Sequence, residues 1–510
     1  YEIVSRDWSS DVCSSDLHIG ISCGFHDAAV SVIDDGGNIA FAGHSERYSK
    51  NKHDKNLCIE LVDDALNSIK GGFKVHYYEK PWLKFLRQVR SGEPIDFKNM
   101  FVDTYIGKDI IQAFDNRVIS TQSHHESHAA AGFQTSPFDD ATVVIIDAIG
   151  EFDTISIWHA SYDRYGYARY RKLWSKKYPD SIGLFYTAMT ERVGLRPLDE
   201  EYILMGMAAY GKTDYYKDLY TDLMENALTL DFKQNLHTGV GKDFLEGVDD
   251  MDIAASSQVL VEHLIENVMR IARKVGKSKN LVYGGGVALN CLANRLLGKY
   301  YDNNIWIMPN PGDAGSSLGA AALGYRRQLN WRDCFLGHNI PGEYPISSTI
   351  NELLTNQIVG VASGRAEFGP RALGNRSLLA DPRGPDIKDK VNAIKRRQKF
   401  RPFAPVILEE FVDQYFYMPH GWRDSRYMQV VATCRYPDLF PAIAHFDSTS
   451  RVQTVPKDGS GIRRLLEQWY ETTHCPMLLN TSLNIRGEPM VNDRSDADRF
   501  EKLYGVKVMS

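Results

Sequence analysis

The sequence predicts a mixed α/β protein, and three observations lead to this prediction. Short apolar runs of strand length alternate with segments in which apolar residues recur at helical spacing. Several of the runs end at a glycine-rich or acidic corner, which is the usual strand-to-helix turn of α/β proteins. The length of 510 residues, set against roughly 150 residues per domain, favours more than one domain.

Composition excludes several classes of protein. With 43% hydrophobic and 24% charged residues, the chain is ordinary for a folded globular protein. Its net charge of −6 provides no whole-chain basic surface, so nucleic acid is not an expected partner. The best apolar run, 141–149, is broken by Asp147 and is too short to span a membrane. The seven scattered cysteines include no Cys-x-x-Cys pair, which predicts reduced thiols and a cytoplasmic location.

Residues 1–17 differ from the rest of the chain. Serine dominates them, no helical or strand period is present, and they lack the pattern of a signal peptide. The string SSDVCSSDL resembles translated adapter sequence, so we expect a non-native or disordered tail and a native start close to His18.

Two domains are predicted after this tail. In residues 18–345, which read as one doubly built domain, strands are predicted at 18–23, 29–33, 39–42, 141–148, 156–160, 280–283 and 305–308. Helices are predicted there at 58–69, 181–193, 200–209, 254–275, 287–297 and 316–328. The polar, irregular segment 329–350 marks the boundary, and the second domain, 346–510, opens with a strand at 358–362.

Two histidines one helical turn apart form the sharpest local motif. His124 and His128 share a helix face, about 5–6 Å apart, which suits two ligands of one metal ion. A pair of core or capping histidines explains this spacing about equally well. Asp313 follows a Pro-Asn-Pro-Gly corner, where it is either a third ligand or a plain N-cap. Two histidines and a carboxylate would suit Fe(II), Mn(II) or Zn(II).

Glycine corners and a basic cluster both suggest phosphate binding. Gly284-Gly285-Gly286 alone would be only a tight turn, but the corners at 24–27 and 147–151 also follow strands, and three such corners would surround a nucleotide. Between residues 360 and 405, eleven Lys or Arg residues face only four acids. Arginines set among glycine and phenylalanine favour gripping of small phosphate groups over a solvated surface or an RNA contact. The segment 480–484 either binds a small polar substrate or forms a turn.

Taken together, these motifs resemble the O-carbamoyltransferases of the NodU/CmcH type. The resemblance runs from about His18 to Val491 and is carried by GISCGFHDAA, HHESHAAAGF, EEYILMGMAAYG, GGGVALNC, PNPGDAGSSLGAA, GRAEFGPRALGNRSLLADPR, FRPFAP, HFDSTSRVQTV and NTSLNIRGEP. It implies an N-terminal actin-like ATPase domain, similar to threonylcarbamoyl-transferring proteins, followed by a YrdC-like domain. The second domain would form carbamoyl adenylate from carbamoyl phosphate and ATP. The first would pass the carbamoyl group to a hydroxyl of a sugar or natural product.

The resemblance also implies roles for individual residues. A divalent metal, expected to be Fe(II), would lie on His124, His128 and Asp313. The catalytic candidates are His26, as a base for the acceptor hydroxyl, with Asp27, Arg371, Lys395 and Arg397. Nucleotide and substrate would be bound by Asp147, Gly284, Gly285, Gly286, Asn290, Arg365, Arg376, Arg401, Arg451, Asn480 and Ser482.

Four positions depart from the family pattern, and two other functions stay open. Where members often have Gly, Lys, Glu and Gly, this chain has Ala148, Ile203, Gln398 and Ser448. A threonylcarbamoyl-type tRNA-modifying enzyme is disfavoured by the acidic charge. A non-catalytic nucleotide-binding protein is disfavoured by the intact candidate ligands. The expected partners are carbamoyl phosphate, ATP and a small hydroxyl-bearing acceptor, and a homodimer is the default oligomer.

Overall fold

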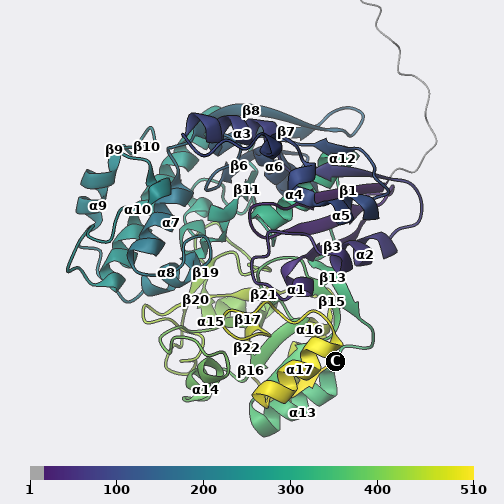
Figure 1. Ribbon diagram of the computed structural model, residues 1–510. Helices are drawn as coiled ribbons and strands as arrows, with labels where there is room; N and C mark the ends of the chain where they lie inside the picture. Colours follow the sequence, from purple (N-terminus) through teal and green to yellow (C-terminus); the bar gives the residue numbers. More distant parts are fainter. Residues whose placement is uncertain (1–16) are drawn as a thin grey trace, which may run out of the picture.

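The computed structural model describes residues 17–510, and it confirms a mixed α/β protein (Figure 1). Strands up to residue 306 form the sheets of the first half, and strands from residue 335 form those of the second half, which lies below it in Figure 1. The tail prediction falls outside the described residues except for Leu17, which begins β1 (Leu17–Ser22). Among the helices of residues 17–510, none combines the length and the apolar character that crossing a membrane requires.

The first half contains two five-stranded sheets of the same topology. One has the order β3-β2-β1-β4-β5, and the other, read from its opposite edge, has the order β8-β7-β6-β11-β12. In each, the central strand pairs antiparallel with a hairpin partner and parallel with a later strand. The remaining strands are β2 (Ala29–Ile33), β3 (Ile39–His44), β4 (Phe73–Tyr77), β5 (Ile119–Thr121), β6 (Asp140–Ile146), β7 (Asp153–Tyr162), β8 (Ala168–Lys177), β11 (Leu281–Gly284) and β12 (Ile305–Trp306). The topology therefore repeats within this half, as the sequence predicts.

Apolar spacing explains most helices of this half. α2 (Ile59–Asn67), α7 (Ile182–Arg192), α8 (Glu201–Met207) and α10 (Asp250–Val275) form where they are predicted. The single helix predicted at 287–297 is wrong. That segment forms the 3₁₀ turn η3 (Gly286–Leu289), the short helix α11 (Cys291–Asn294) and the 3₁₀ turn η4 (Leu297–Lys299). The helix restarts because the Asn290 side chain accepts a hydrogen bond from the backbone N–H of Ala293 and caps α11.

Small residues bring α6 (His124–Thr135) and α12 (Ser316–Tyr325) into close contact. A methyl group on Gly319 would lie 1.8 Å from the carbonyl oxygen of Ser127, so only glycine allows this approach. Gly20 of β1 meets the carbonyl oxygen of Ser317 in the same way. α12 is thus fixed between β1 and α6. The 3₁₀ turn η5 (Asp313–Gly315) directly precedes α12, so this packing places Asp313 beside the histidines of α6.

α3 (Pro81–Arg90) has a reversed amphipathic pattern. Lys84 and Arg87 are buried beneath it, whereas Trp82, Leu86 and Val89 are exposed. An ordinary surface helix places its apolar residues toward the core. Here Lys84 instead points inward to an ion pair with Glu79, and Arg87 packs on the ring of Tyr178, beside the buried Phe85.

The second half is built on a sheet of order β21-β17-β22-β16-β14-β23. Successive residues point to opposite faces, so that Leu478 belongs to the core under α13 (Ile346–Asn356) and α16 (Gly461–Thr473), while Leu479 belongs to the core with α14 (Ile387–Ile394) and α17 (Arg494–Tyr504). The strands are β14 (Ile358–Ala362), β16 (Arg376–Ala380), β17 (Ala404–Leu408), β21 (Gln453–Val455), β22 (Met477–Ser482) and β23 (Val508–Met509). The pair β13 (Phe335–Ile340) and β15 (Gly364–Glu367) lies at the predicted boundary.

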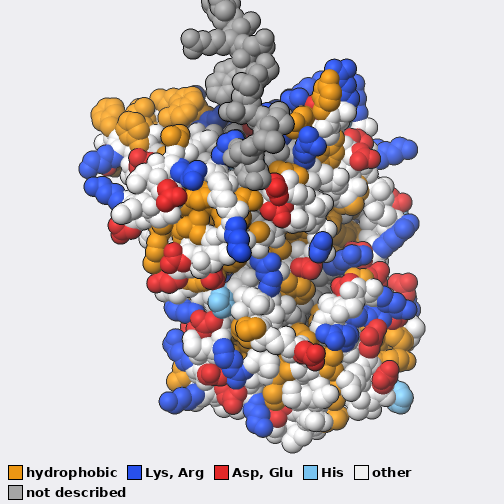
Figure 2. Space-filling view, turned by 90° about the vertical axis from the view of Figure 1, so that its right-hand side faces the viewer, with side chains coloured by type: hydrophobic (Ala, Val, Ile, Leu, Met, Phe, Trp, Pro, Cys, Tyr) orange, Lys and Arg blue, Asp and Glu red, His pale blue; other side chains and the backbone are white. Residues whose placement is uncertain are grey.

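On the face shown in Figure 2, acidic and basic side chains are interspersed with one another. The other elements of the fold are short. The short elements are α1 (Glu46–Ser49), α4 (Asp103–Ile106), α5 (Lys108–Ala113), α9 (Tyr216–Leu223), α15 (Val412–Tyr415), β9 (Met224–Asn226), β10 (Asp231–Phe232), β18 (Phe416–Tyr417), β19 (Val431–Cys434), β20 (Thr449–Arg451), η1 (Phe97–Met100), η2 (Leu236–Thr238) and η6 (Glu409–Phe411).

Candidate active site

A cavity of about 400 Å³ is lined by residues from both halves of the chain. Imidazole and carboxylate groups come from the loops after β1 and β6 and from the turn before α12, and guanidinium and amino groups come from the second half. The predicted site residues that line the cavity are His26, Asp27, Asp147, Gly286, Asn290, Asp313, Arg371, Lys395, Arg397, Arg401, Arg451, Asn480 and Ser482.

His124, His128, Asp147 and Asp313 form a buried group whose candidate ligand atoms all lie within 4.8 Å of one another. Nε2 of His124 lies 3.2 Å from Nε2 of His128 and 3.0 Å from Oδ2 of Asp147. Nε2 of His128 lies 3.2 Å from Oδ1 of Asp313. The structure thus brings the three predicted ligands together. Asp147, expected at the nucleotide, has its carboxylate among them and becomes a fourth candidate ligand.

Charge interactions hold these four residues in ionised form. Burial acts to lower the pKa of His124, but the carboxylates of Asp313 and Asp147 outweigh it and raise this pKa well above its ordinary value. Burial likewise acts to raise the pKa of Asp147, and the two histidines outweigh it and lower that pKa. A divalent cation placed between the same groups would replace the imidazolium protons as the counter-charge. Two imidazoles and two buried carboxylates fit Fe(II), Mn(II) or Zn(II).

Two further carboxylates lie behind the histidines. Oε1 of Glu151 accepts hydrogen bonds from the backbone N–H groups of His124, at 2.9 Å, and Lys80, at 3.0 Å, and so satisfies the first N–H of α6. Oε2 of Glu79 lies 3.6 Å from Nδ1 of His124, and Lys84 donates a hydrogen bond to Oε1 of Glu79 at 2.8 Å. Glu151 belongs to the predicted corner 147–151, which gave it no role of its own, and no motif includes Glu79 or Lys84.

Six basic side chains of the second half line the cavity: Arg371, Lys395, Arg397, Arg401, Arg451 and Arg486. Arg486 is paired with Glu200 of the first half, and the other five have no acidic partner among residues 17–510. Burial, reinforced by the charge of Arg451, lowers the pKa of Arg371 to about 9. Burial, reinforced by Arg397 and Arg401, lowers the pKa of Lys395. Like charges without a counter-ion in a buried cavity create a site for an anion, and guanidinium groups match the geometry of phosphate oxygens.

The end of β22 holds Lys395 and presents an unused acceptor. Nζ of Lys395 donates hydrogen bonds to the hydroxyl of Ser482 at 3.1 Å and to Oδ1 of Asn484 at 2.8 Å. Nδ2 of Asn480 donates to Oε1 of Gln453 at 2.7 Å, and its buried Oδ1 has no partner in the described chain. That oxygen is placed to accept an N–H of a bound amide. Asn484 belongs to the segment 480–484, for which substrate binding was one of the two interpretations, but it was not singled out as a site residue.

Two arginines predicted to bind phosphate lie outside the cavity. Arg376 is fully buried, and its guanidinium donates hydrogen bonds to backbone carbonyl oxygens that include those of Ser363 and Asn492. Arg365 donates to the carbonyl oxygens of Ala40 and Leu336. Neither arginine lines the cavity, and the donors of Arg376 are occupied by backbone carbonyl oxygens, so the structure gives no support to phosphate binding by these two residues.

The triple-glycine corner serves mainly as a tight turn. Gly284 and Gly285 do not line the cavity. Gly285 has a φ of +87°, and a methyl group on it would lie 2.2 Å from the carbonyl oxygen of Ile146. The N–H of Gly286 donates to Oδ1 of Asp147 at 3.1 Å, so it orients a candidate metal ligand. The nucleotide contact predicted for Gly284 and Gly285 is therefore corrected to a packing role.

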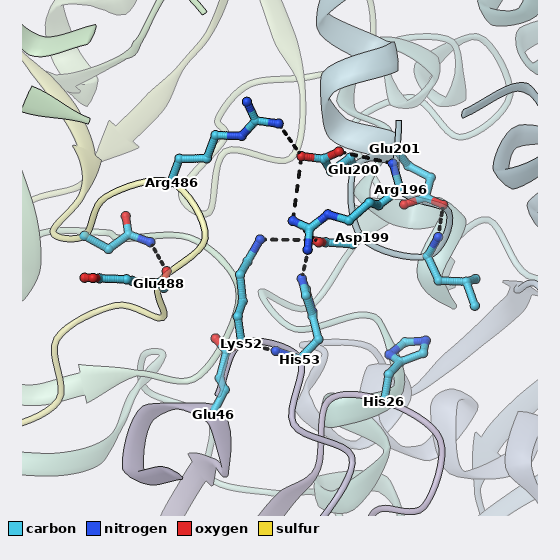
Figure 3. A network of polar contacts seen from close by, with 12 residues as sticks. His26, Glu46, Lys52, His53, Arg196, Asp199, Glu200, Glu201, Arg486 and Glu488 are labelled. Atoms are coloured by element: carbon cyan, nitrogen blue, oxygen red, sulfur yellow. Dashed lines mark hydrogen bonds and ion pairs between the residues drawn. The ribbon is translucent and has the colours of Figure 1, made fainter. Parts of the chain in front are cut away.

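His26 and Asp27 belong to a polar network that joins the two halves. Figure 3 shows the part of this network that runs from His53 to Arg486. Nδ1 of His26 lies 3.0 Å from Oδ2 of Asp27, and burial, which lowers the pKa of His26, is outweighed by Asp27, so this pKa rises to about 9. His53 lies 2.8 Å from both Asp27 and Asp199.

Arg196 extends this network from Asp199 to Glu200. Arg486, from the loop after β22, donates to Glu200 at 2.7 Å and completes the link to the second half. His53 and Asp199 were absent from the predicted site, because nothing in the sequence signals that their loops converge.

Only one of the four departures from the family pattern reaches the cavity. Ala148 lines it, next to Asp147, whereas Ile203 is buried in the core of the first half. Oε1 of Gln398 is buried without a partner in the described chain. Ser448 has a φ of +62°, a conformation that glycine adopts at lower cost.

Comparison with known proteins gives matches over most of the chain. Residues 58–322 match the family model for the carbamoyltransferase N-terminus, and residues 350–509 match that for the carbamoyltransferase C-terminus. An uncharacterised protein of Synechocystis sp. is 31% identical, over 94% of this chain and 93% of that protein. The nodulation protein NolO of Bradyrhizobium diazoefficiens is 32% identical, over 74% and 75%. The 3′-hydroxymethylcephem-O-carbamoyltransferase of Amycolatopsis lactamdurans is 28% identical, over 76% and 79%.

Proposed function

Since the chain is an enzyme of the carbamoyltransferase family, of the NodU/CmcH type, we propose that it transfers a carbamoyl group from carbamoyl phosphate to a hydroxyl of a sugar or natural product, with consumption of ATP. The observation that supports this proposal is the cavity in which Asp147 and Asp313, the two carboxylates of the candidate ligand group, lie opposite a cluster of basic side chains without acidic partners in the described chain. Residues 346–510 activate the carbamoyl group, and residues 18–345 transfer it.

Activation is the task of the basic cluster. Carbamate is a poor electrophile, and adenylation gives it a phosphate leaving group. Carbamoyl phosphate, ATP and water yield carbamoyl adenylate, pyrophosphate and phosphate. Arg371, Arg397 and Arg401 neutralise and position the phosphate groups, because their charges lack counter-ions in the described chain. Asn480 accepts a hydrogen bond from the carbamoyl amide through its unpartnered Oδ1.

Transfer takes place on the first-half side of the cavity. His124, His128, Asp147 and Asp313 would hold a divalent metal, for which we propose Fe(II), and the metal would supply positive charge that polarises an oxygen atom. His26, oriented by Asp27, accepts the proton of the acceptor hydroxyl as the new C–O bond forms and AMP leaves. Only neutral His26 can accept this proton, and because its pKa is about 9, the share of this form increases as the pH rises toward that value.

The test separates the two steps. Metal-loaded protein is given ATP and ¹⁴C-labelled carbamoyl phosphate, and the release of pyrophosphate is measured. A panel of glycosides is then added, and transfer of the label to them is followed by mass spectrometry. We expect His128→Ala to keep pyrophosphate release and lose transfer, and Arg371→Ala to lose pyrophosphate release. No pyrophosphate from metal-loaded wild-type protein would contradict the proposal. Loss of both steps in His128→Ala would contradict the division between the halves.

A further inference from the structure

The ring of His124 has one nitrogen directed at the candidate ligand group and one directed away from it. Nε2 lies 3.0 Å from Asp147, 3.2 Å from His128 and 3.5 Å from Asp313. A histidine that binds a metal through Nε2 carries its remaining proton on Nδ1. Nδ1 of His124 is buried and forms no hydrogen bond within the described chain, so its proton requires an acceptor nearby.

The carboxylate of Glu79 faces this nitrogen. Its Oε2 lies 3.6 Å from Nδ1 of His124, and the two side chains are only 4% and 2% exposed. Lys84 donates a hydrogen bond of 2.8 Å to the other carboxylate oxygen. The ammonium group of Lys84 thus supplies the counter-charge of this buried carboxylate and fixes its orientation.

The chain around Glu79 is fixed to the start of α6 by a second contact. One carboxylate oxygen of Glu151 accepts hydrogen bonds from the backbone N–H groups of both Lys80 and His124. The segment that carries Glu79 is thereby held against the residue that it faces. The reversed pattern of α3 has the same origin, because Lys84 must point inward to reach Glu79.

We propose that Glu79 is a positioning residue of the metal site, which accepts the Nδ1 proton of His124 and so fixes the ring with Nε2 toward the ion. Lys84 keeps Glu79 charged and correctly turned. The inference rests on the proposed function only in taking His124 as a metal ligand. Carboxylates behind a ligating histidine typically contribute tenfold to hundredfold to metal affinity.

The experiment measures metal affinity and needs no acceptor substrate. Co²⁺ is titrated anaerobically into metal-free wild-type protein, Glu79→Gln and Glu126→Gln, and its visible absorption gives the dissociation constant. Glu126 lies on the same helix as His124 but outside the ligand group, so its variant is the matched control. We expect Co²⁺ to bind Glu79→Gln between tenfold and a hundredfold more weakly, and Glu126→Gln within twofold of wild type.

A second variant covers the case in which Glu79→Gln fails to fold because Lys84 loses its partner. Glu79→Leu with Lys84→Met removes both charges together, which is less disruptive than leaving one of them buried alone. It is expected to keep the wild-type unfolding temperature without metal within a few degrees and to show the same loss of affinity. Wild-type affinity in a folded Glu79 variant would overturn the inference alone. Absence of Co²⁺ binding by wild-type protein would overturn the metal site of the proposed function as well.

Discussion

Nε2 of His124 lies 3.0 Å from Oδ2 of Asp147, although 23 residues separate them in the chain. Asp147 follows β6, and the N–H of Gly286 binds its other oxygen, so the carboxylate is aimed at the histidines from a rigid position. This contact makes Asp147 part of the metal site and provides the first prediction.

Asp147→Asn removes one charge and preserves the size of the side chain. Because an amide is a much weaker ligand than a carboxylate, we expect the metal content to fall below about a tenth of wild type. Elemental analysis of the purified protein measures this, with Asp163→Asn, in an exposed turn, as the control. Pyrophosphate release should persist. Full metal content in Asp147→Asn would show that this carboxylate is no ligand.

Arg371→Ala removes a cavity arginine that has no acidic partner among the described residues. Hydrogen bonds between charged groups contribute about 1.5–3 kcal/mol, so we expect the KM for ATP or carbamoyl phosphate to rise by about tenfold to a hundredfold. Metal content should not change. Arg383→Ala is the control, since Arg383 is paired with Asp381 away from the cavity. Equal kinetics in the two variants would show that Arg371 contacts no phosphate.

Anions should stabilise the protein, because the basic side chains of the cavity repel one another when no anion is bound. A ligand at a hundred times its Kd adds about 2.7 kcal/mol to stability, which corresponds to about 5 °C in Tm for a large domain. We therefore expect pyrophosphate to raise the Tm by about this much in a thermal-shift measurement. The rise should shrink in Arg371→Ala, and no rise in wild-type protein would contradict an anion site.

His53 should make stability depend on pH. Burial lowers the pKa of His53, but hydrogen bonds to Asp199 and Asp27 outweigh it and raise this pKa to about 10. A pKa that is raised on folding stabilises the protein fully below the unfolded value near 6.5 and loses this effect as the pH rises through 10. His53→Gln should therefore lower the free energy of urea unfolding at pH 6 and have little effect near pH 11. A deficit that is independent of pH would indicate a packing defect instead.

Buried strands and small-residue helices were predictable because their physical signals are local. β1 and β6 are rich in apolar residues, and all but one residue of each is buried, as expected for strands that are covered on both faces. The small residues of α12 predict close packing of this helix. That packing places Asp313 beside the histidines.

Residue roles set by contacts distant in the chain were not predictable. Arg371 and Arg376 occupy similar glycine-rich surroundings, yet only the second meets the carbonyl oxygen of Asn492, more than a hundred residues away. Glu79 belongs to no motif of the sequence, and the neighbouring α3 gives a misleading signal. Its apolar residues at helical spacing, Trp82, Leu86 and Val89, lie on the exposed face, whereas Lys84 points inward to the ion pair with Glu79.

The orientation of α3 also affects how the protein behaves at high concentration. With its cations turned inward, the helix leaves Trp82 and Leu86 each 47% exposed on the outer surface. Such side chains adhere to other molecules in crowded solution, and glutamine at both positions would lessen that adhesion. The interior contacts that maintain the fold of this region would be left untouched, which makes these two sites the natural first targets for improving solubility.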